Sequence, residues 1–386
     1  MGAGATMQNT IRRAAGSLLV VGLGGTELTG LERAWLRLVR PGGVILFRRN
    51  IIDAAQTRAL VDESTGLGAP HGVRCVDVEG GTVNRLRDAL APMPSAQAVA
   101  QADRVAAPKR PFARVHGELI ARAVKAFGFN TTLAPVVDLI LPESVEVMGA
   151  RAPAANPLEA ARFARNFLLG LGAQDVAGCG KHFPGLGGAA GDTHFVTPAI
   201  ARTWQQLWTE DLVPYRDLHA AIPMIMTNHA AYPASRGAGE PASASRYWIT
   251  TVLRRQIGYR GIILSDDLEM GGILKFLPVE EAAVAAIRAG SDLLEICHSA
   301  ELILRTYESL ITAAEKSSAF RTLLLERARD CERKRARIYP PRKARPLTAA
   351  QFEKLRGEIT QFRDKITAVT QAQDAEARAT SPAERT

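Results

Sequence analysis

The segment from Lys181 to His194 (KHFPGLGGAAGDTH) holds the residues of this sequence that are best suited to proton transfer. Asp192 and His194 lie two positions apart, so in extended backbone their side chains point to the same side. A carboxylate beside an imidazole orients the ring and raises its pKa, which gives a group that donates and accepts protons near neutral pH. The middle of the segment is rich in Gly and Ala. We therefore predict a mobile loop that carries His194 to a substrate.

Polar or ionisable side chains follow four short apolar runs. They are Asp77 and Glu79 after the run at 73–76, Lys181 and His182 after 176–180, Asn228 and His229 after 223–227, and Ser265, Asp266 and Asp267 after 261–264. If these runs are parallel strands, their carboxyl ends meet at one edge, where barrel enzymes place their reactive groups. The sequence therefore predicts a reactive site built from four strand ends.

Taken one at a time, these residues also fit ordinary structural roles. Asp266 or Asp267 could cap the following helix by accepting hydrogen bonds from its free amides. Lys181 could be a solvated lysine, and His182 and His229 could be core histidines whose ring nitrogens are satisfied. The convergence of all of them on one edge favours a reactive site over these separate roles.

Eight runs rich in Val, Ile and Leu alternate with segments of helical spacing, the pattern of parallel strands that are buried on both faces. The runs are Leu18 to Gly22, Val44 to Phe47, Val73 to Asp77, Thr131 to Val136, Val176 to Gly180, Pro223 to Thr227, Gly261 to Leu264 and Asp292 to Ile296. Eight alternations predict an α/β fold of the closed (β/α)8 TIM-barrel type. An open doubly wound sheet is the alternative, but Gly22-Leu23-Gly24-Gly25 lacks the full G-x-G-x-x-G pattern.

The chain divides into three parts on composition. We expect an N-terminal arm at 1–14, a single barrel domain at 15–338 and a charged, helical or disordered tail at 339–386. Prolines at 340, 341 and 346 interrupt helix continuity before the tail. The last stretch, Ala368 to Thr386, is polar and poor in large apolar residues, so we expect it to be disordered or frayed.

The net charge gives little support for nucleic-acid binding. The chain of 386 residues has 48 Lys and Arg against 39 Asp and Glu, a formal charge of +9. Seven of the basic residues lie in the run Arg333 to Arg345, which has no acid, so the rest of the chain is nearly neutral. Such a run is typical of the solvated end of a helix, and we expect no nucleic-acid partner.

Cysteine usage and hydropathy indicate a chain of a reducing compartment. The four cysteines have no close pairs and no metal-ligand spacing, and three lie in apolar surroundings, so we expect buried free thiols. No apolar stretch approaches the roughly 18 residues of a membrane span. Arg12-Arg13 before AAGSLLVVGLGG could imitate a secretory signal, but its glycines favour a first core strand. We expect a cytoplasmic protein.

Two further features have modest interpretations. Trp204 and Trp208 lie four positions apart, which is helical spacing, so we expect them to pack against each other and the body rather than to form a stacking platform for a ligand. Asp138 in LAPVVDL is expected to fix a loop rather than to contact a substrate.

Six segments, in order from about Leu18 to Cys297, carry a family resemblance. They are GGVILFRRN, VDVEGGTVNRL, LAPVVDL, KHFPGLGG with AGDTH, MTNHAAYP, and GYRGIILSDDLEMGG. They resemble the successive signatures of glycoside hydrolase family 3, and in particular its bacterial β-N-acetylhexosaminidases of the NagZ type, which recycle cell-wall fragments. The Asp-x-His loop is the feature that separates these enzymes from the β-glucosidases of the family.

The resemblance implies a role for each matching residue. Asp266 would be the nucleophile that forms a covalent glycosyl-enzyme and gives retention of configuration, and His194, oriented by Asp192, would be the acid and base. The residues that would hold the hydroxyls and the N-acetyl group of the sugar are Asp77, Arg85, Arg151, Lys181 and His182.

The implied function is an exo-acting β-N-acetylglucosaminidase that releases terminal N-acetylglucosamine from muropeptide fragments. Its partner would be a small carbohydrate, and it would need no metal and no organic cofactor. Three alternatives stay open. On the same fold the enzyme could be a β-glucosidase or a phosphorylase, because a neutral histidine lets phosphate approach. The chain could also be a non-catalytic sugar-binding relative that docks through Arg333 to Arg345.

Overall fold

Eight parallel strands close into a barrel, which confirms the predicted fold class over the open sheet. The computed structural model describes residues 2–189, 198–237, 239–340 and 345–380, with residues 2–5 and 374–380 as backbone only. Around the barrel the strands follow the order β1-β10-β9-β8-β7-β6-β3-β2. Their bounds are β1 (Leu19–Gly22), β2 (Gly43–Leu46), β3 (Val73–Val76), β6 (Thr131–Thr132), β7 (Ala177–Phe183), β8 (Met224–Thr227), β9 (Ile262–Asp267) and β10 (Leu293–Ile296).

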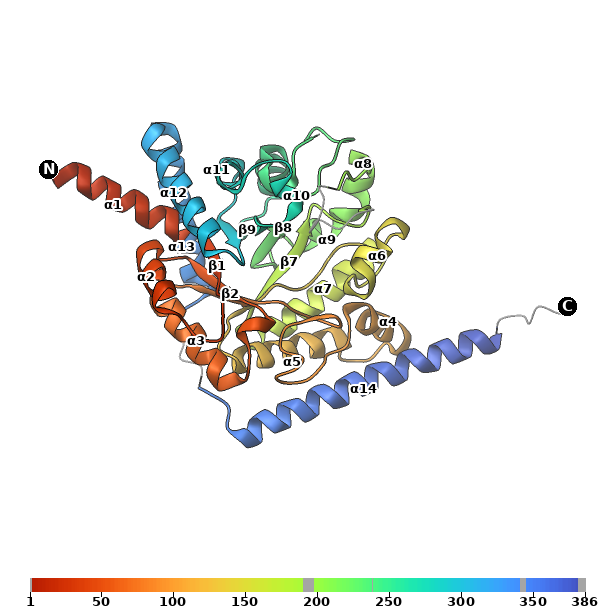
Figure 1. The fold of residues 1–386 in the computed structure, drawn as a ribbon. Helices are drawn as coiled ribbons and strands as arrows, with labels where there is room; N and C mark the ends of the chain where they lie inside the picture. Colours follow the sequence, from red (N-terminus) through yellow and green to blue (C-terminus); the bar gives the residue numbers. More distant parts are fainter. Residues whose placement is uncertain (1, 190–197, 238, 341–344, 381–386) are drawn as a thin grey trace.

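Helices surround the barrel, and one of them, α14, extends past the body of the molecule (Figure 1). The α-helices are α1 (Gly2–Ser17), α2 (Gly30–Val39), α3 (Ala54–Gly66), α4 (Ala96–Ala106), α5 (Phe112–Ala126), α6 (Val145–Met148), α7 (Pro157–Gly172), α8 (Trp204–Gln206), α9 (Val213–Leu218), α10 (Gly271–Leu274), α11 (Val279–Ala289), α12 (Ala300–Lys316), α13 (Ser318–Ile338) and α14 (Ala349–Thr380). Shorter 3-10 turns are η1 (Arg48–Asn50), η2 (Pro142–Ser144), η3 (Gly149–Arg151) and η5 (Ala242–Ala244), and η4 (Leu207–Asp211) and η6 (Tyr247–Gln256) are π-helical.

The strands form where the apolar runs predict them, because parallel strands in a barrel are buried on both faces. Two of the strands are longer than the apolar runs. β7 continues through Lys181 and His182 to Phe183, which pairs with β8, and β9 continues through Asp266 to Asp267, which pairs with β10. The charged residues that we expected just after the strands are therefore held by the strand ends themselves.

β6 is shorter than predicted. The apolar run suggested a strand to Val136, but the strand ends at Thr132. Pro135 has no backbone N–H and cannot donate to a ladder, so the chain leaves the sheet before it. Val136 makes only an isolated parallel bridge to Lys181.

A small antiparallel hairpin follows β3 outside the barrel. Its strands are β4 (Val78–Gly80) and β5 (Val83–Asn84). The Arg85 amide closes it by donating to the Asp77 carbonyl oxygen over 3.0 Å. This hairpin continues from the carboxyl end of β3 and carries Glu79 on its first strand.

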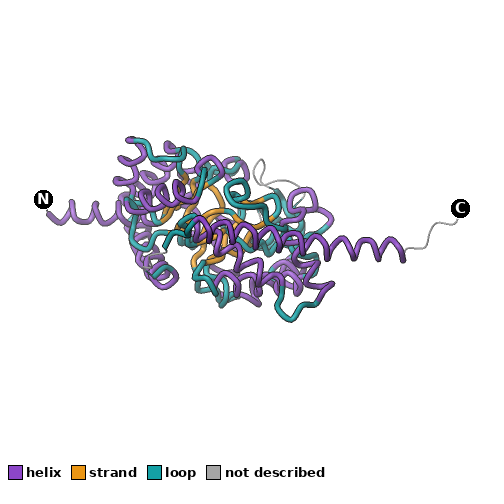
Figure 2. Tube along the Cα trace, turned by 90° about the horizontal axis from the view of Figure 1, so that it is seen from below, coloured by secondary structure: helices purple, strands orange, loops and turns teal. Residues whose placement is uncertain are grey.

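Both ends of the described part of the chain are helical. α1, where we expected an arm, contacts α12 and α13 and buries Ile11, Ala14 and Ala15. α14 occupies the expected tail and lies along α4 and α5, as the views in Figures 1 and 2 show. It is described to Thr380, so it runs into the polar segment that we predicted to be disordered or frayed, and residues 381–386 lie outside the described chain.

The basic run after Arg333 is not simply solvated, which corrects the sequence-based expectation. Lys334 donates to Asp292 over 3.0 Å, and the buried Arg335 donates to the Gly42 carbonyl oxygen over 2.8 Å. Two of its charges thus tie α13 to the amino ends of β2 and β10. Within the described part of the chain, no helix combines the length and apolar composition that a bilayer crossing requires.

Candidate active site

Lys181 lies at the centre of a buried group of charges at the carboxyl ends of β3 and β7. Its ammonium group contacts Asp77 Oδ1 at 2.8 Å and Glu79 Oε1 at 2.7 Å. The Arg151 guanidinium, from η3, donates two hydrogen bonds of 2.9 Å each to the Glu79 carboxylate. Two cations and two carboxylates balance one another, which is the condition for keeping charges out of water.

The protonation states of this group follow from its contacts. Burial by itself would raise the pKa of the Glu79 carboxyl, but Arg151 and Lys181 lower that pKa well below its ordinary range. Burial would lower the pKa of the Lys181 ammonium, but Asp77 and Glu79 raise it above its ordinary value. Lys181 therefore stays a cation and Glu79 a carboxylate at every physiological pH.

His182, the next residue of β7, is held by Asp138. The Asp138 Oδ2 atom lies 2.7 Å from His182 Nδ1 and accepts the His182 amide at 3.0 Å. Its Oδ1 atom accepts the Leu186 amide at 2.8 Å, so Asp138 also fixes the chain after β7, as we predicted. A carboxylate on Nδ1 places the ring proton there and makes Nε2 the acceptor nitrogen of the ring. Arg151 Nη2 is 3.4 Å from this Nε2 atom.

Asp266, on β9, presents a carboxylate to the same region. Its side chain is partly exposed. Burial would raise its pKa, but His182, His229 and the Asp267 amide, which donates to Oδ1 over 3.0 Å, lower the pKa below the ordinary value. The Asp266 carboxylate is therefore ionised near neutral pH. It does not cap α10, whose N-cap residue is Met270.

His229 has the structural role that we kept as its alternative. It is fully buried, with Nδ1 at 2.7 Å from Ser243 Oγ and Nε2 at 2.9 Å from the Asp267 carbonyl oxygen. Both ring nitrogens have partners, and one of these contacts holds the end of β9.

Arg85 closes the group on the side of the β4–β5 hairpin. Its Nη2 atom lies 3.8 Å from Asp77 Oδ2, and its guanidinium lies over the Phe47 ring at 5.7 Å. About a third of the Arg85 side chain is exposed, 32%, so it can still contact a bound molecule. The five residues predicted to hold a sugar thus lie in one connected group.

The two remaining predicted residues, Asp192 and His194, fall in 190–197, outside the described residues. Sequence reasoning also gave too little weight to Glu79, which we noted as ionisable but did not assign to the site. The sequence did indicate Glu79 as a site residue, because it follows Asp77 by two positions in VDVEGG.

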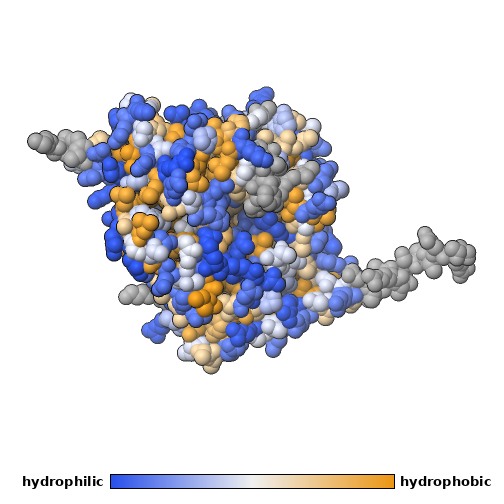
Figure 3. All heavy atoms as spheres, viewed as in Figure 1, coloured by the Kyte–Doolittle hydropathy of each residue, from blue (hydrophilic) through white to orange (hydrophobic). Residues whose placement is uncertain are grey.

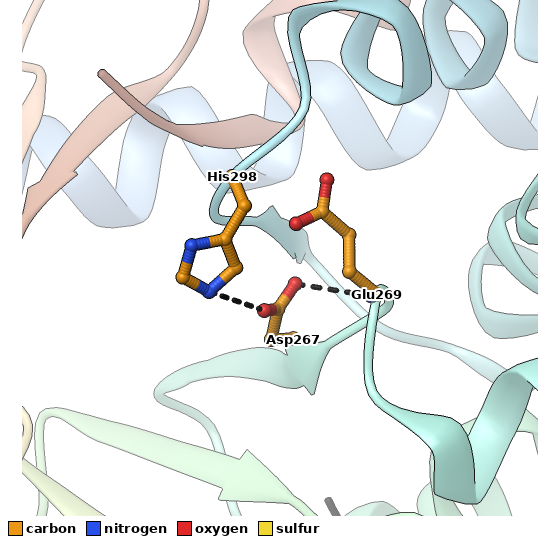
Figure 4. A group of neighbouring side chains, drawn as sticks. All are labelled: Asp267, Glu269 and His298. Carbon is orange, nitrogen blue, oxygen red and sulfur yellow. Dashed lines mark hydrogen bonds and ion pairs between the residues drawn. The ribbon is translucent and has the colours of Figure 1, made fainter. Parts of the chain in front are cut away.

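A second group of polar residues lies beside Asp266 at the ends of β9 and β10 (Figure 4). Asp267, Glu269 and His298 bring ligand-type atoms within 4.8 Å of one another. Arg49 Nη1 lies 3.0 Å from His298 Nδ1, and because arginine only donates, Nδ1 accepts and the proton sits on Nε2. The Nε2 atom of His298 lies 3.6 Å from Asp267 Oδ2.

The two tryptophans pack as expected. The Trp204 and Trp208 ring centroids are 5.3 Å apart, and Trp204 also contacts Trp248 at 6.3 Å. All four cysteines are buried and free, which confirms that prediction as well.

Fold and site together define a class of protein. A (β/α)8 barrel with an ionised carboxylate beside a buried cluster of directional hydrogen-bonding groups has the features of an enzyme that acts on a small polar molecule. The face seen in Figure 3 is hollowed near its middle, and hydrophilic residues surround the hollow.

Comparison with known proteins specifies this class. Residues 10–328 match the glycosyl hydrolase family 3 N terminal domain, and the chain therefore belongs to glycoside hydrolase family 3. It is 33% identical over 303 residues to a beta-hexosaminidase of Idiomarina loihiensis, covering 78% of this chain and 90% of that protein. It is 37% identical over 287 residues to one of Chromobacterium violaceum, covering 73% and 79%. The resemblance seen in the sequence is confirmed, and the chain is a glycoside hydrolase.

Solved structures show the same relationship. A family 3 beta-N-acetylglucosaminidase from Paenibacillus sp. str. FPU-7 superposes with a TM-score of 0.80 at 27% identity, over 91% of this chain and 68% of that one. NagZ from Neisseria gonorrhoeae, solved with N-trifluoroacetyl-D-glucosamine, superposes with a TM-score of 0.68 at 29% identity, over 81% and 98%.

Proposed function

We propose that this chain is a retaining exo-β-N-acetylglucosaminidase that removes terminal N-acetylglucosamine from muropeptide fragments in the cytoplasm. The observation that carries the proposal is the ionised Asp266 carboxylate beside the buried cluster of Lys181, Asp77, Glu79 and Arg151. The relatives named beta-hexosaminidase and the N-acylated glucosamine bound by the Neisseria gonorrhoeae protein support the choice of sugar. The four free thiols support a reducing compartment.

The first chemical step joins the sugar to the enzyme. An Asp266 oxygen attacks the anomeric carbon while the bond from that carbon to the leaving oxygen breaks, and His194 gives its proton to the leaving oxygen. The product is a glycosyl ester on Asp266 with inverted configuration. The Asp266 charge is available for this attack because its neighbours lower its pKa.

The second step releases the sugar. His194, now neutral, takes a proton from water as the water oxygen attacks the anomeric carbon from the opposite face, and the bond to Asp266 breaks. The carboxylate returns, and two inversions give net retention. The assignment of His194 and its orienting partner Asp192 comes from the family resemblance and the Asp-x-His spacing.

The buried cluster would position the sugar for both steps. The Asp77 carboxylate accepts hydrogen bonds, and the Lys181 ammonium and the Arg85 and Arg151 guanidinium groups donate them, which suits vicinal hydroxyls. His182 Nε2 adds a group that Asp138 holds in a fixed direction. Because these groups are paired before the substrate arrives, little reorganisation is needed on binding.

The test is hydrolysis of a chromogenic N-acetyl-β-glucosaminide by the wild type and by Asp266→Asn and His194→Gln. Asp266→Asn should lose on the order of 10³-fold or more in kcat, as is typical when a reacting group is removed. Asp62→Asn, which changes an exposed carboxylate on α3, is the control. Equal rates in the wild type and Asp266→Asn would refute the proposal.

Two further measurements separate the alternatives. Trapping with a 2-deoxy-2-fluoro or similar slow glycosyl donor, followed by peptide mapping, should label Asp266, and a label elsewhere would contradict the assignment. Product analysis with and without phosphate should give free sugar in both cases. Sugar 1-phosphate would indicate a phosphorylase, faster cleavage of a β-glucoside would indicate a β-glucosidase, and binding without turnover would indicate a sugar-binding relative.

A further inference from the structure

The C-terminal helix α14 lies outside the region that matches the family, since the match ends at residue 328 and α14 begins at Ala349. It packs along α4 and α5 on the side of the barrel (Figures 1 and 2). One face of the helix is buried. It carries four apolar residues at spacings of four, three and four positions, namely Leu355, Ile359, Phe362 and Ile366. This periodic burial shows that α14 is docked through a specific face.

From this face, one line of contacts leads towards the active site through His116. The Phe362 ring stacks on His116 of α5 at 5.9 Å, and the His116 ring is fully buried. The Cε1–Nε2 edge of the His116 ring lies against Gly80 of the hairpin. A Cβ on Gly80 would be only 3.0 Å from His116 Cε1, and 2.2 Å from the Pro94 carbonyl oxygen.

Gly80 directly follows Glu79, the carboxylate that holds Lys181 and Arg151. Its φ is +95°, a conformation that glycine adopts without strain, and the absence of a side chain lets the backbone come close to His116. His116 therefore packs against the backbone next to Glu79, and Phe362 covers His116.

A second line of contacts runs through Arg356. Its Nε atom donates to the Leu90 carbonyl oxygen over 3.0 Å. Leu90 closes a turn with Leu86, whose carbonyl oxygen accepts the Leu90 amide at 2.9 Å, and Leu86 is the neighbour of Arg85. Both lines of contacts thus end on the segment 79–90. One ends at Gly80, the neighbour of Glu79, and the other ends at Leu90, which is hydrogen-bonded to the neighbour of Arg85.

We propose that α14 is a positioning element of the active site, which through Phe362, His116 and Arg356 holds the segment 79–90 in the geometry that binds the sugar. This inference rests on the proposed function of the Lys181 cluster. No residue of α14 contacts the cluster itself within the described structure, so its action is indirect. Weakening the docked face should loosen the segment and weaken substrate binding before it affects the chemical step.

The experiment uses the full chain with two variants that disturb the two lines separately, Phe362→Leu and Arg356→Gln. Each should raise KM by about 3- to 10-fold with a smaller change in kcat, at a temperature where circular dichroism shows the protein folded. Hydrogen–deuterium exchange of peptides that cover 79–95 should become faster in both. Arg356→Lys, which retains a donor, should recover part of the loss.

Matched controls on the same helix distinguish positioning from stability. Glu358→Gln removes the ion pair to Arg122 of α5, a contact of α14 that does not reach the segment. Gln361→Ala changes an exposed neighbour of Phe362. Glu358→Gln should lower Tm without raising KM, and Gln361→Ala should change neither.

The outcome that overturns the inference is a lower Tm in Phe362→Leu and Arg356→Gln with KM, kcat and exchange at 79–95 unchanged. If Phe362→Leu does not fold, Arg356→Gln decides. Failure of the proposed function is recognised separately, because Asp266→Asn would then retain activity, whereas the exchange measurement reports on the segment whatever the substrate is.

Discussion

The buried histidine under α14 gives a sharp prediction about stability and pH. Neither ring nitrogen of His116 has a hydrogen-bond partner among the described residues, and the ring lies between Phe167 at 5.5 Å and Phe362 at 5.9 Å. Burial lowers the pKa of His116 from 6.5 to about 3, because removing the ring from solvent disfavours its charged form. The folded protein therefore keeps His116 neutral at pH values where the unfolded chain protonates it.

The sign and the size follow from linkage. Below pH 6.5 the unfolded state binds a proton at this residue and the folded state does not until about pH 3, so stability is complete above 6.5 and is lost as pH falls through this window. Each pH unit inside the window costs about 1.4 kcal/mol. Between pH 7 and pH 5, His116 should therefore remove about 2 kcal/mol from the free energy of unfolding.

The assay compares urea unfolding of the wild type and His116→Phe at pH 7 and pH 5. Other titrating groups also lower the stability of both proteins between pH 7 and pH 5. The loss in the free energy of unfolding should nevertheless be about 2 kcal/mol larger in the wild type than in His116→Phe. His219→Phe, at a partly exposed histidine after α9, controls for the loss of a histidine and should behave like the wild type. Equal losses in the wild type and His116→Phe would refute the reasoning, since they would mean that His116 is protonated or solvated in the folded state.

Three other predictions concern buried polar groups and thiols. Lys181→Met leaves the Asp77 and Glu79 carboxylates without their shared cation, so it should lower the free energy of unfolding by about 3–5 kcal/mol and abolish activity. Urea unfolding and the chromogenic assay measure the two effects. A stable, active variant would contradict the assigned pairing. Glu295 is buried with Oε1 unpartnered among the described residues, and burial raises its pKa well above the ordinary value. The contribution of Glu295 to stability should therefore fall as pH rises above about 4.5. Glu295→Met should raise the free energy of unfolding by about 1–3 kcal/mol, and by more at pH 8 than at pH 5. No gain at either pH would argue against a buried neutral acid. All four cysteines should be unreactive towards a thiol reagent until urea unfolds the chain, and prompt labelling of the native protein would show that at least one is accessible.

The alternation of apolar and helical segments was sufficient to predict the barrel. Strands buried on both faces must be apolar throughout, so each of the eight leaves a local signal in the sequence. The carboxyl ends of such strands share one edge, so Asp77, Lys181 and Asp266 could be expected near one another before any coordinates were known. The strand boundaries were less certain, because charged residues at the ends of β7 and β9 have no apolar signal although their backbones still pair.

The sequence by itself determined the barrel, the edge where the site lies and the types of residue that gather there, because these follow from local periodicity and chain order. Only the tertiary structure decided which charges neutralise one another. Lys181 meets Asp77 across 104 positions of chain, and Glu79 pairs with Arg151 across 72. Only the tertiary structure showed that Phe362 of the last helix covers His116. Pairings of this kind depend on distance and burial after folding, and neither leaves a periodic trace in the sequence.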